Sequence, residues 1–145
     1  MKPQDIVDAA RETLGTPYRP RARINGLAID CAGVPVYAAQ KLGIPTEPFV
    51  PHGRLPIPLE MRAQLDSLWT RVAKSQMQIG DVAWIRMIET GETQHLGIVG
   101  NYCFGGFSLI HAYNHCGLDR VVEHRLDGQW FSRIVGVWRF PGVDA

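Results

Sequence analysis

The sequence lacks long apolar runs and carries no excess of charge of either sign. No stretch of its 145 residues approaches the roughly eighteen continuous apolar residues of a membrane span, so we expect no membrane-spanning segment. Lysine and arginine total 15 against 14 aspartates and glutamates, a net charge of +1. This balance predicts no nucleic-acid partner and no anionic membrane partner. The first residues carry acids and lack an apolar stretch, so we expect no signal peptide and synthesis in a cytoplasm.

Cysteine is also scarce. The chain has three cysteines, Cys31, Cys103 and Cys116, and an odd number at irregular spacing argues against a disulfide framework. We expect ordinary packing for the second and third of them. The absence of a C-x-x-C pair argues against a structural metal, so we expect no metal and no cofactor. A zinc site remains a minor alternative, drawn from His95, His111, His115, Cys103 and Cys116.

The apolar pattern predicts helices first and strands afterwards. This length fits a single domain, 1–145. Helices are expected over residues 4–14, from Asp30 to Gly43, and from Pro58 onward. Between the last two, five prolines predict an irregular connection, which often borders a site. Strands are expected at 81–87, 96–99, 107–113, 120–126 and 134–140. Such an order is typical of an α+β domain with an antiparallel sheet.

One cysteine stands where a helix is expected to begin. Asp30 is a plausible N-cap, which places Cys31 in the first turn, where the helix dipole favours a thiolate. Backbone N–H groups there could hold a developing oxyanion. Pro35 conflicts with a helix that starts at Asp30, so either the first turn is irregular or the helix begins nearer Gly33. Cys31 is thus a candidate nucleophile, with a buried, small apolar residue as the alternative.

A thiol nucleophile needs a base and a group that orients the base. His95 opens one expected strand, and Gly97 on the same face leaves room for another group. His111 lies in the next strand, so antiparallel pairing could bring the two imidazoles together. Cysteine on a helix followed by histidines on strands is the order of papain-like thiol hydrolases. No motif supports His115 or His124, and His52 is expected to face solvent.

Five short blocks together resemble the NlpC/P60 family of cell-wall peptidases. They occur in the family's order, and the resemblance covers about residues 5–140. The blocks are Leu14–Tyr18, Asp30–Gly33, Gly80–Trp84, His95–Val99 and Ile110–Ala112. The resemblance implies a papain-like fold in which Cys31 attacks an amide, His95 is the base and His111 orients it. It also implies that Tyr18 lines the site near the oxyanion and that Asp30 holds a free amine of the stem peptide.

The resemblance further implies a substrate and a setting. The substrate is a peptidoglycan stem peptide, cut at a D-Glu-γ-linked bond through a thioester. The short form is similar to the phage and prophage branch, so phage tail proteins are expected partners and virion association is expected. Ala32 replaces the serine that usually follows the nucleophile, and Pro35 is unusual, so the cleavage preference stays open. The alternatives are a non-catalytic tail protein that keeps the fold, a packed Tyr18, and an Asp30 that only caps the helix.

Overall fold

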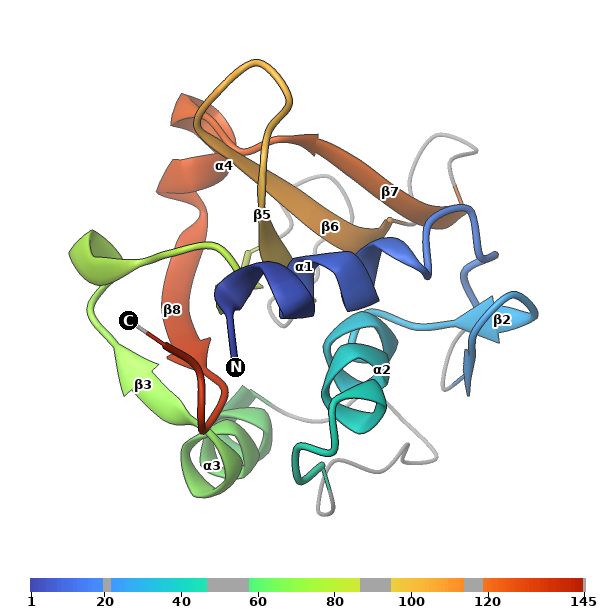
Figure 1. Ribbon diagram of the computed structural model, residues 1–145, viewed down its shortest axis with the longest axis horizontal. Coiled ribbons are helices and arrows are strands. Elements are labelled where there is room, and N and C mark those ends of the chain that lie inside the picture. Colours follow the sequence, from blue (N-terminus) through green and yellow to red (C-terminus); the bar gives the residue numbers. More distant parts are fainter. Residues whose placement is uncertain (20–21, 47–57, 87–94, 114–118, 145) are drawn as a thin grey trace.

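The structure is a computed structural model that describes residues 1–19, 22–46, 58–86, 95–113 and 119–144. Its centre is an antiparallel six-stranded sheet with helices against one face (Figure 1). The spatial order of the strands is β3-β8-β4-β5-β6-β7. The strands are β3 (Thr70–Val72), β4 (Val82–Ile85), β5 (His95–Asn101), β6 (Phe107–Tyr113), β7 (Arg120–Arg125) and β8 (Ile134–Arg139). The α+β fold predicted from the sequence is confirmed.

The remaining elements are short. The helices are α1 (Pro3–Arg11), α2 (Gly33–Lys41), α3 (Pro58–Leu68) and α4 (Gly128–Ser132), with a 3-10 turn, η1, at Lys74–Gln76. Two further strands, β1 (Arg23–Ile24) and β2 (Ala28–Ile29), form a separate hairpin. The sequence did not predict this hairpin, β3 or α4, because two to five residues carry too little periodicity to be recognised.

The first helix is shorter than expected. It ends at Arg11 rather than at residue 14, and the Thr13 hydroxyl then donates to the Ala10 carbonyl at 2.7 Å. Gly15, at a φ of +84°, completes the turn, since glycine adopts this left-handed conformation at little cost. The amphipathic pattern was right, but a side chain that competes for backbone acceptors ends the helix early.

Apolar residues fill both faces of the sheet. On one face, α1, α2 and α3 pack against alternate strand residues, among them Leu96, Ile98 and Ile110. The other face carries a smaller core that includes Val99 and Leu109, with Trp130 of α4 packed against it. Successive residues of a strand point to opposite faces, so the two cores interleave along β5 and β6. Among the described residues, no helix combines the length and apolar character needed to cross a bilayer.

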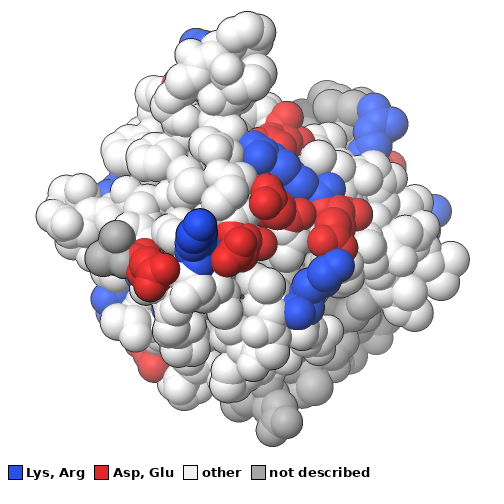
Figure 2. Space-filling model, in the orientation of Figure 1, with Lys and Arg blue, Asp and Glu red and all other residues white. Residues whose placement is uncertain are grey.

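Charges of both signs are mixed over the surface that carries α1 and α2. Figure 2 shows acidic and basic side chains next to one another there. Lys41 contacts Glu12 at 2.6 Å, and Arg11 contacts Glu123 of β7 at 2.8 Å. Opposite charges that neutralise each other locally leave no broad field of a single sign on this face, in keeping with the balanced composition.

Candidate functional site

Cys31 lies in the turn before α2 rather than inside the helix, where it was expected. Ala32 occupies the N-cap position and the helix begins at Gly33. The Gly33 N–H donates to Asp30 Oδ1 at 2.9 Å and lies 3.0 Å from the Asp30 carbonyl. The prediction that Asp30 is the N-cap is therefore wrong by two residues, although its carboxylate does accept from the start of the helix.

Pro35 explains this shift. With the helix beginning at Gly33, the proline is its third residue, and a backbone N–H in the first turn has no intrahelical acceptor to lose. The close turn also requires glycine, because a Cβ on Gly33 would overlap the Ile29 side chain. Cys31 is 6% exposed, so its sulfur lies in a buried turn at the positive end of α2.

Strand contacts place this turn at one end of the sheet. Pro17 bridges to Arg120 at the start of β7, and Tyr18 bridges to Ile29. Arg120 in turn pairs with Tyr113, the last residue of β6. Because neighbouring strands are antiparallel, β5 begins at the end where β6 finishes. The Cys31 turn therefore lies beside the end at which His95 opens β5, and α2 contacts both β5 and β6.

At this end the structure brings two histidines together. His95 Nε2 lies 2.7 Å from His111 Nδ1, and the rings meet edge to face at 4.9 Å between centroids. Both are buried, at 2% and 0% exposed. Gly97 makes room for the pair, because a Cβ there would stand 3.1 Å from the His111 Cβ. A buried, hydrogen-bonded pair of imidazoles of this kind can hold a base in one orientation.

Burial keeps His111 neutral. Its pKa is well below that of an ordinary histidine, chiefly because the charged form would lose its hydration, and secondarily because the imidazoles of His95 and His124 lie nearby. A neutral ring donates through one nitrogen and accepts through the other. His111 is therefore suited to orient a neighbouring base rather than to carry charge itself.

A third histidine, which no sequence motif supported, completes the cluster. His124 Nε2 lies 2.8 Å from His111 Nε2, and His124 Nδ1 lies 2.9 Å from the Arg125 carbonyl. The Trp130 ring covers it, with centroids 4.5 Å apart. On β7 this residue pairs with Leu109, so it shares a face with His111. The sequence predicted both strands but not the register in which they pair, so the position of His124 beside His111 was not evident from it.

The two substrate-contact candidates lie near the same turn. Tyr18 is 7% exposed and belongs to the core on the helix side, and its backbone N–H donates to the Asp119 carbonyl at 2.8 Å. Asp30 is partly buried, between β2 and the cysteine. Packing and capping thus account for part of what each residue does, and their contact with substrate stays a prediction.

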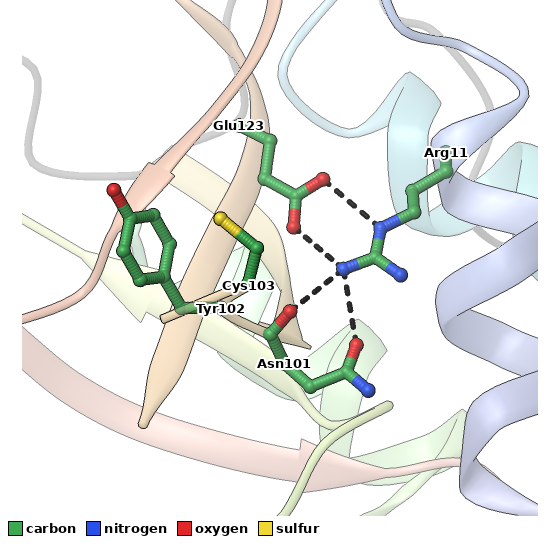
Figure 3. Close-up of a pocket in the computed structure, with 5 residues that line it drawn as sticks. All are labelled: Arg11, Asn101, Tyr102, Cys103 and Glu123. Atoms are coloured by element: carbon green, nitrogen blue, oxygen red, sulfur yellow. Dashed lines mark hydrogen bonds and ion pairs between the residues drawn. The ribbon is translucent and has the colours of Figure 1, made fainter. Parts of the chain in front are cut away.

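A separate pocket of about 560 Å³ lies at the opposite end of β5. Figure 3 shows Arg11 bonded to both Glu123 oxygens and to Asn101, with Tyr102 and Cys103 alongside. Cys103 is exposed, so the prediction that it is packed is wrong. None of the five described lining residues is a histidine.

The described residues contain no group of three or more side chains that could hold a metal ion. The three imidazoles bond to one another in a row, an arrangement unlike the convergence of ligands on one point that zinc requires. His115, Cys116 and His52 lie outside the described residues.

Two solved structures share this fold. The NlpC/p60 domain of the peptidoglycan hydrolase SagA superposes with a TM-score of 0.64 and 23% identity, over 95% of this chain and 98% of that one. A Staphylococcus aureus protein, described as similar to a lipoprotein of the NLP/P60 family, gives 0.61 and 23%. This chain is matched over 94% of its length but spans only 40% of that protein. Neither a scan of family models nor a search of curated proteins found a match.

Proposed function

We propose that this protein, with its NlpC/P60 fold, is a cysteine peptidase that hydrolyses an amide bond of peptidoglycan stem peptides. In this proposal Cys31 is the nucleophile, His95 the base and His111 the group that orients it. The observation that carries the proposal is the buried 2.7 Å hydrogen bond between His95 and His111, at the end of the sheet beside the Cys31 turn. The known domain with this fold in a peptidoglycan hydrolase supports the choice of substrate.

The chemistry follows the usual course of thiol hydrolysis. His95 takes the thiol proton, the Cys31 sulfur attacks the amide carbon, and an oxyanion forms. Backbone N–H groups of the turn before α2 stabilise that oxyanion. The C–N bond breaks as His95 passes its proton to the leaving amine, and a thioester remains. Water, deprotonated by His95, then releases the acid and restores the thiol.

The first experiment tests the nucleophile. A γ-D-Glu-linked stem peptide is incubated with the protein and its products are identified by mass spectrometry, next to an α-linked peptide of the same composition. We expect the native protein to cleave the γ-linked peptide. The Cys103→Ser variant should cleave it as well, because Cys103 lies in the other pocket. Cys31→Ala should abolish cleavage. Cleavage that survives in Cys31→Ala would remove the mechanism.

The second experiment tests whether Cys31 and His95 act as a pair. In a Cys103→Ser/Cys116→Ser background, Cys31 is the sole thiol. A nearby imidazole that accepts the proton raises the thiolate fraction, so iodoacetamide should alkylate Cys31 faster than a free thiol at mildly acidic pH. His95→Gln should remove that advantage and lower kcat by about 100-fold or more, as loss of a general base does. Equal alkylation rates with and without His95 would show that His95 does not accept the proton of the Cys31 thiol.

The tail-protein alternative makes a different prediction in the same experiments. A structural protein that only keeps the fold would leave the γ-linked peptide intact and would show ordinary thiol reactivity. The association with phage or prophage tails stays a prediction from the sequence resemblance. Co-purification of this protein with tail proteins from induced cells is the measurement that tests it.

A further inference from the structure

His124 ends a row of three imidazoles, and its position fixes where each proton of that row lies. A carbonyl oxygen can only accept, so the 2.9 Å contact with the Arg125 carbonyl requires a hydrogen on His124 Nδ1. A neutral His124 then presents the lone pair of Nε2 to His111, 2.8 Å away. His111 must therefore donate from its own Nε2. These hydrogen positions are assigned from the hydrogen-bond network.

The tautomer of His111 in turn fixes that of His95. A neutral His111 that donates from Nε2 has its lone pair on Nδ1, so the 2.7 Å contact requires a hydrogen on His95 Nε2. Neutral His95 then has its lone pair on Nδ1. That nitrogen is the one able to take a proton from a thiol in the proposed mechanism.

We propose that His124 and the Arg125 carbonyl act as a positioning pair, which sets the tautomers of His111 and His95 and so places the basic lone pair of His95 on Nδ1. The tautomer assignment stands on the hydrogen-bond geometry of three neutral rings. Its consequence for catalysis rests on the proposed function, in which His95 is the base.

Protonation of His124 reverses the direction of both hydrogen bonds between the three imidazoles. With hydrogens on both nitrogens, His124 donates from Nε2, so His111 accepts at Nε2 and donates from Nδ1. His95 Nε2 must then accept, and the hydrogen of a neutral His95 moves to Nδ1. The neutral row holds three N–H hydrogens and the protonated row four, so one added proton accounts for the whole change. A proton on the outer ring therefore disables the base as effectively as a proton on His95.

The same path runs outward during catalysis. When His95 Nδ1 takes the thiol proton, its Nε2 hydrogen can pass to His111 Nδ1, and the His111 Nε2 hydrogen can pass to His124 Nε2. The positive charge then lies on His124, which is partly exposed, while His111 is fully buried. Moving charge from a buried ring to one that water reaches lowers the cost of desolvation.

The surroundings of His124 hold few other charges among the described residues. His111 faces it from β6, and Trp130 covers it from α4. The Arg133 guanidinium lies over that tryptophan, 5.0 Å from its ring centroid. The neighbouring Glu123 points to the other face of β7, where it bonds to Arg11 and Ser108. This leaves His124 as the titratable group that links the row to solvent.

The test measures tautomers and activity separately. Long-range proton–nitrogen NMR spectra distinguish Nδ1–H from Nε2–H rings without any substrate. In Cys31→Ala at about pH 8, above the ordinary histidine pKa, we expect Nε2–H at His95 and His111 and Nδ1–H at His124. His124→Gln, whose amide oxygen can still accept from His111, should keep the first two tautomers. His124→Leu, which cannot accept, should lose them. Unchanged tautomers in His124→Leu would overturn the proposal, whatever the peptidase activity.

Activity is read as separate kcat and KM values at about pH 8, above the ordinary histidine pKa, in the protein with Cys31 intact. We expect His124→Leu to lose about tenfold in kcat with little change in KM, the rate equivalent of one hydrogen bond. His124→Gln should keep most of the activity, because its amide oxygen still accepts from the His111 Nε2–H. Glu123→Gln is the matched control: it weakens the contacts of β7 with Arg11 and Ser108 on the opposite face and should lower the melting temperature without changing kcat. A kcat in His124→Gln as low as that in His124→Leu, or a kcat in His124→Leu equal to that of the native protein, would overturn the proposal.

Discussion

The side chain of His111 shows how much one residue depends on its neighbours. It bonds to a histidine at each nitrogen, and the rings of Tyr113 and Trp130 meet it edge-on at 5.2 and 5.5 Å between centroids. Beneath it, Gly97 supplies the space that a side chain would take. The orientation of this imidazole is therefore set by packing on every side rather than by its own rotamer preference.

Gly97→Ala tests that dependence at the scale of one methyl group. The added Cβ would stand 2.7 Å from Leu109 Cδ1 and 3.1 Å from the His111 Cβ. The first contact is shorter than real Cβ contacts and the second is tighter than most of them, so we expect a loss of about 1–3 kcal/mol in the free energy of unfolding, the usual cost of overpacking. Peptidase activity should fall further than stability explains, because His111 must move. Chemical denaturation and kcat measure the two effects.

Gly128→Ala is the control for that substitution. Nothing lies within 4 Å of a Cβ at this position in α4, and alanine is a better helix former than glycine by up to about 1 kcal/mol. Stability should stay the same or rise. A Gly97→Ala protein as stable and as active as Gly128→Ala would show that the space beside His111 is not needed.

At the scale of elements, one buried carboxylate joins β8 to the start of β4. Asp81 is 0% exposed, and Arg139 donates to both of its oxygens, at 2.9 and 3.0 Å. The Gln78 N–H donates to the same carboxylate at 2.9 Å. Asp81 belongs to the block Gly80–Trp84 that carries part of the family resemblance, so this block has a structural role apart from any chemistry.

Arg139→Met removes one side of this pair and leaves the buried carboxylate without its counter-ion. Breaking a buried pair in this way costs about 3 kcal/mol or more, so we expect a loss of that size in urea denaturation. Arg62→Met breaks an exposed pair, at 3.8 Å from Asp66 on α3, and should change stability by about 0.5 kcal/mol or less. Similar losses in the two variants would mean that burial gives the Asp81 pair no special weight.

The stability of the whole molecule should depend on pH through His111. Burial holds the pKa of His111 well below the ordinary value. Below about pH 6.5, therefore, His111 binds a proton in the unfolded chain but not in the folded one. The free energy of unfolding should therefore be constant above that pH. It should fall by about 1.4 kcal/mol per pH unit below it. Urea denaturation from pH 8 to pH 5 measures the slope.

Two variants isolate the groups responsible. His111→Gln should lose the part of the slope that comes from one proton, and a slope equal to that of the native protein would contradict the assignment. Glu123 acts at lower pH: burial alone would raise its pKa, but hydrogen bonds from Arg11 and Ser108 outweigh burial and lower it. Its stabilising contribution is lost as the pH falls below about 4.3, and Glu123→Gln should remove only that later loss.

Local patterns in the sequence determined the α+β class, the amphipathic α1 and the strands β4 to β8, because hydrophobic period and turn residues act over a few positions. They also singled out Cys31, His95 and His111 as residues able to carry thiol chemistry. Only the tertiary structure decided that Cys103 is exposed and that His124 joins the other two histidines. Those outcomes depend on strand register and on contacts between segments far apart in the chain, which no local pattern encodes.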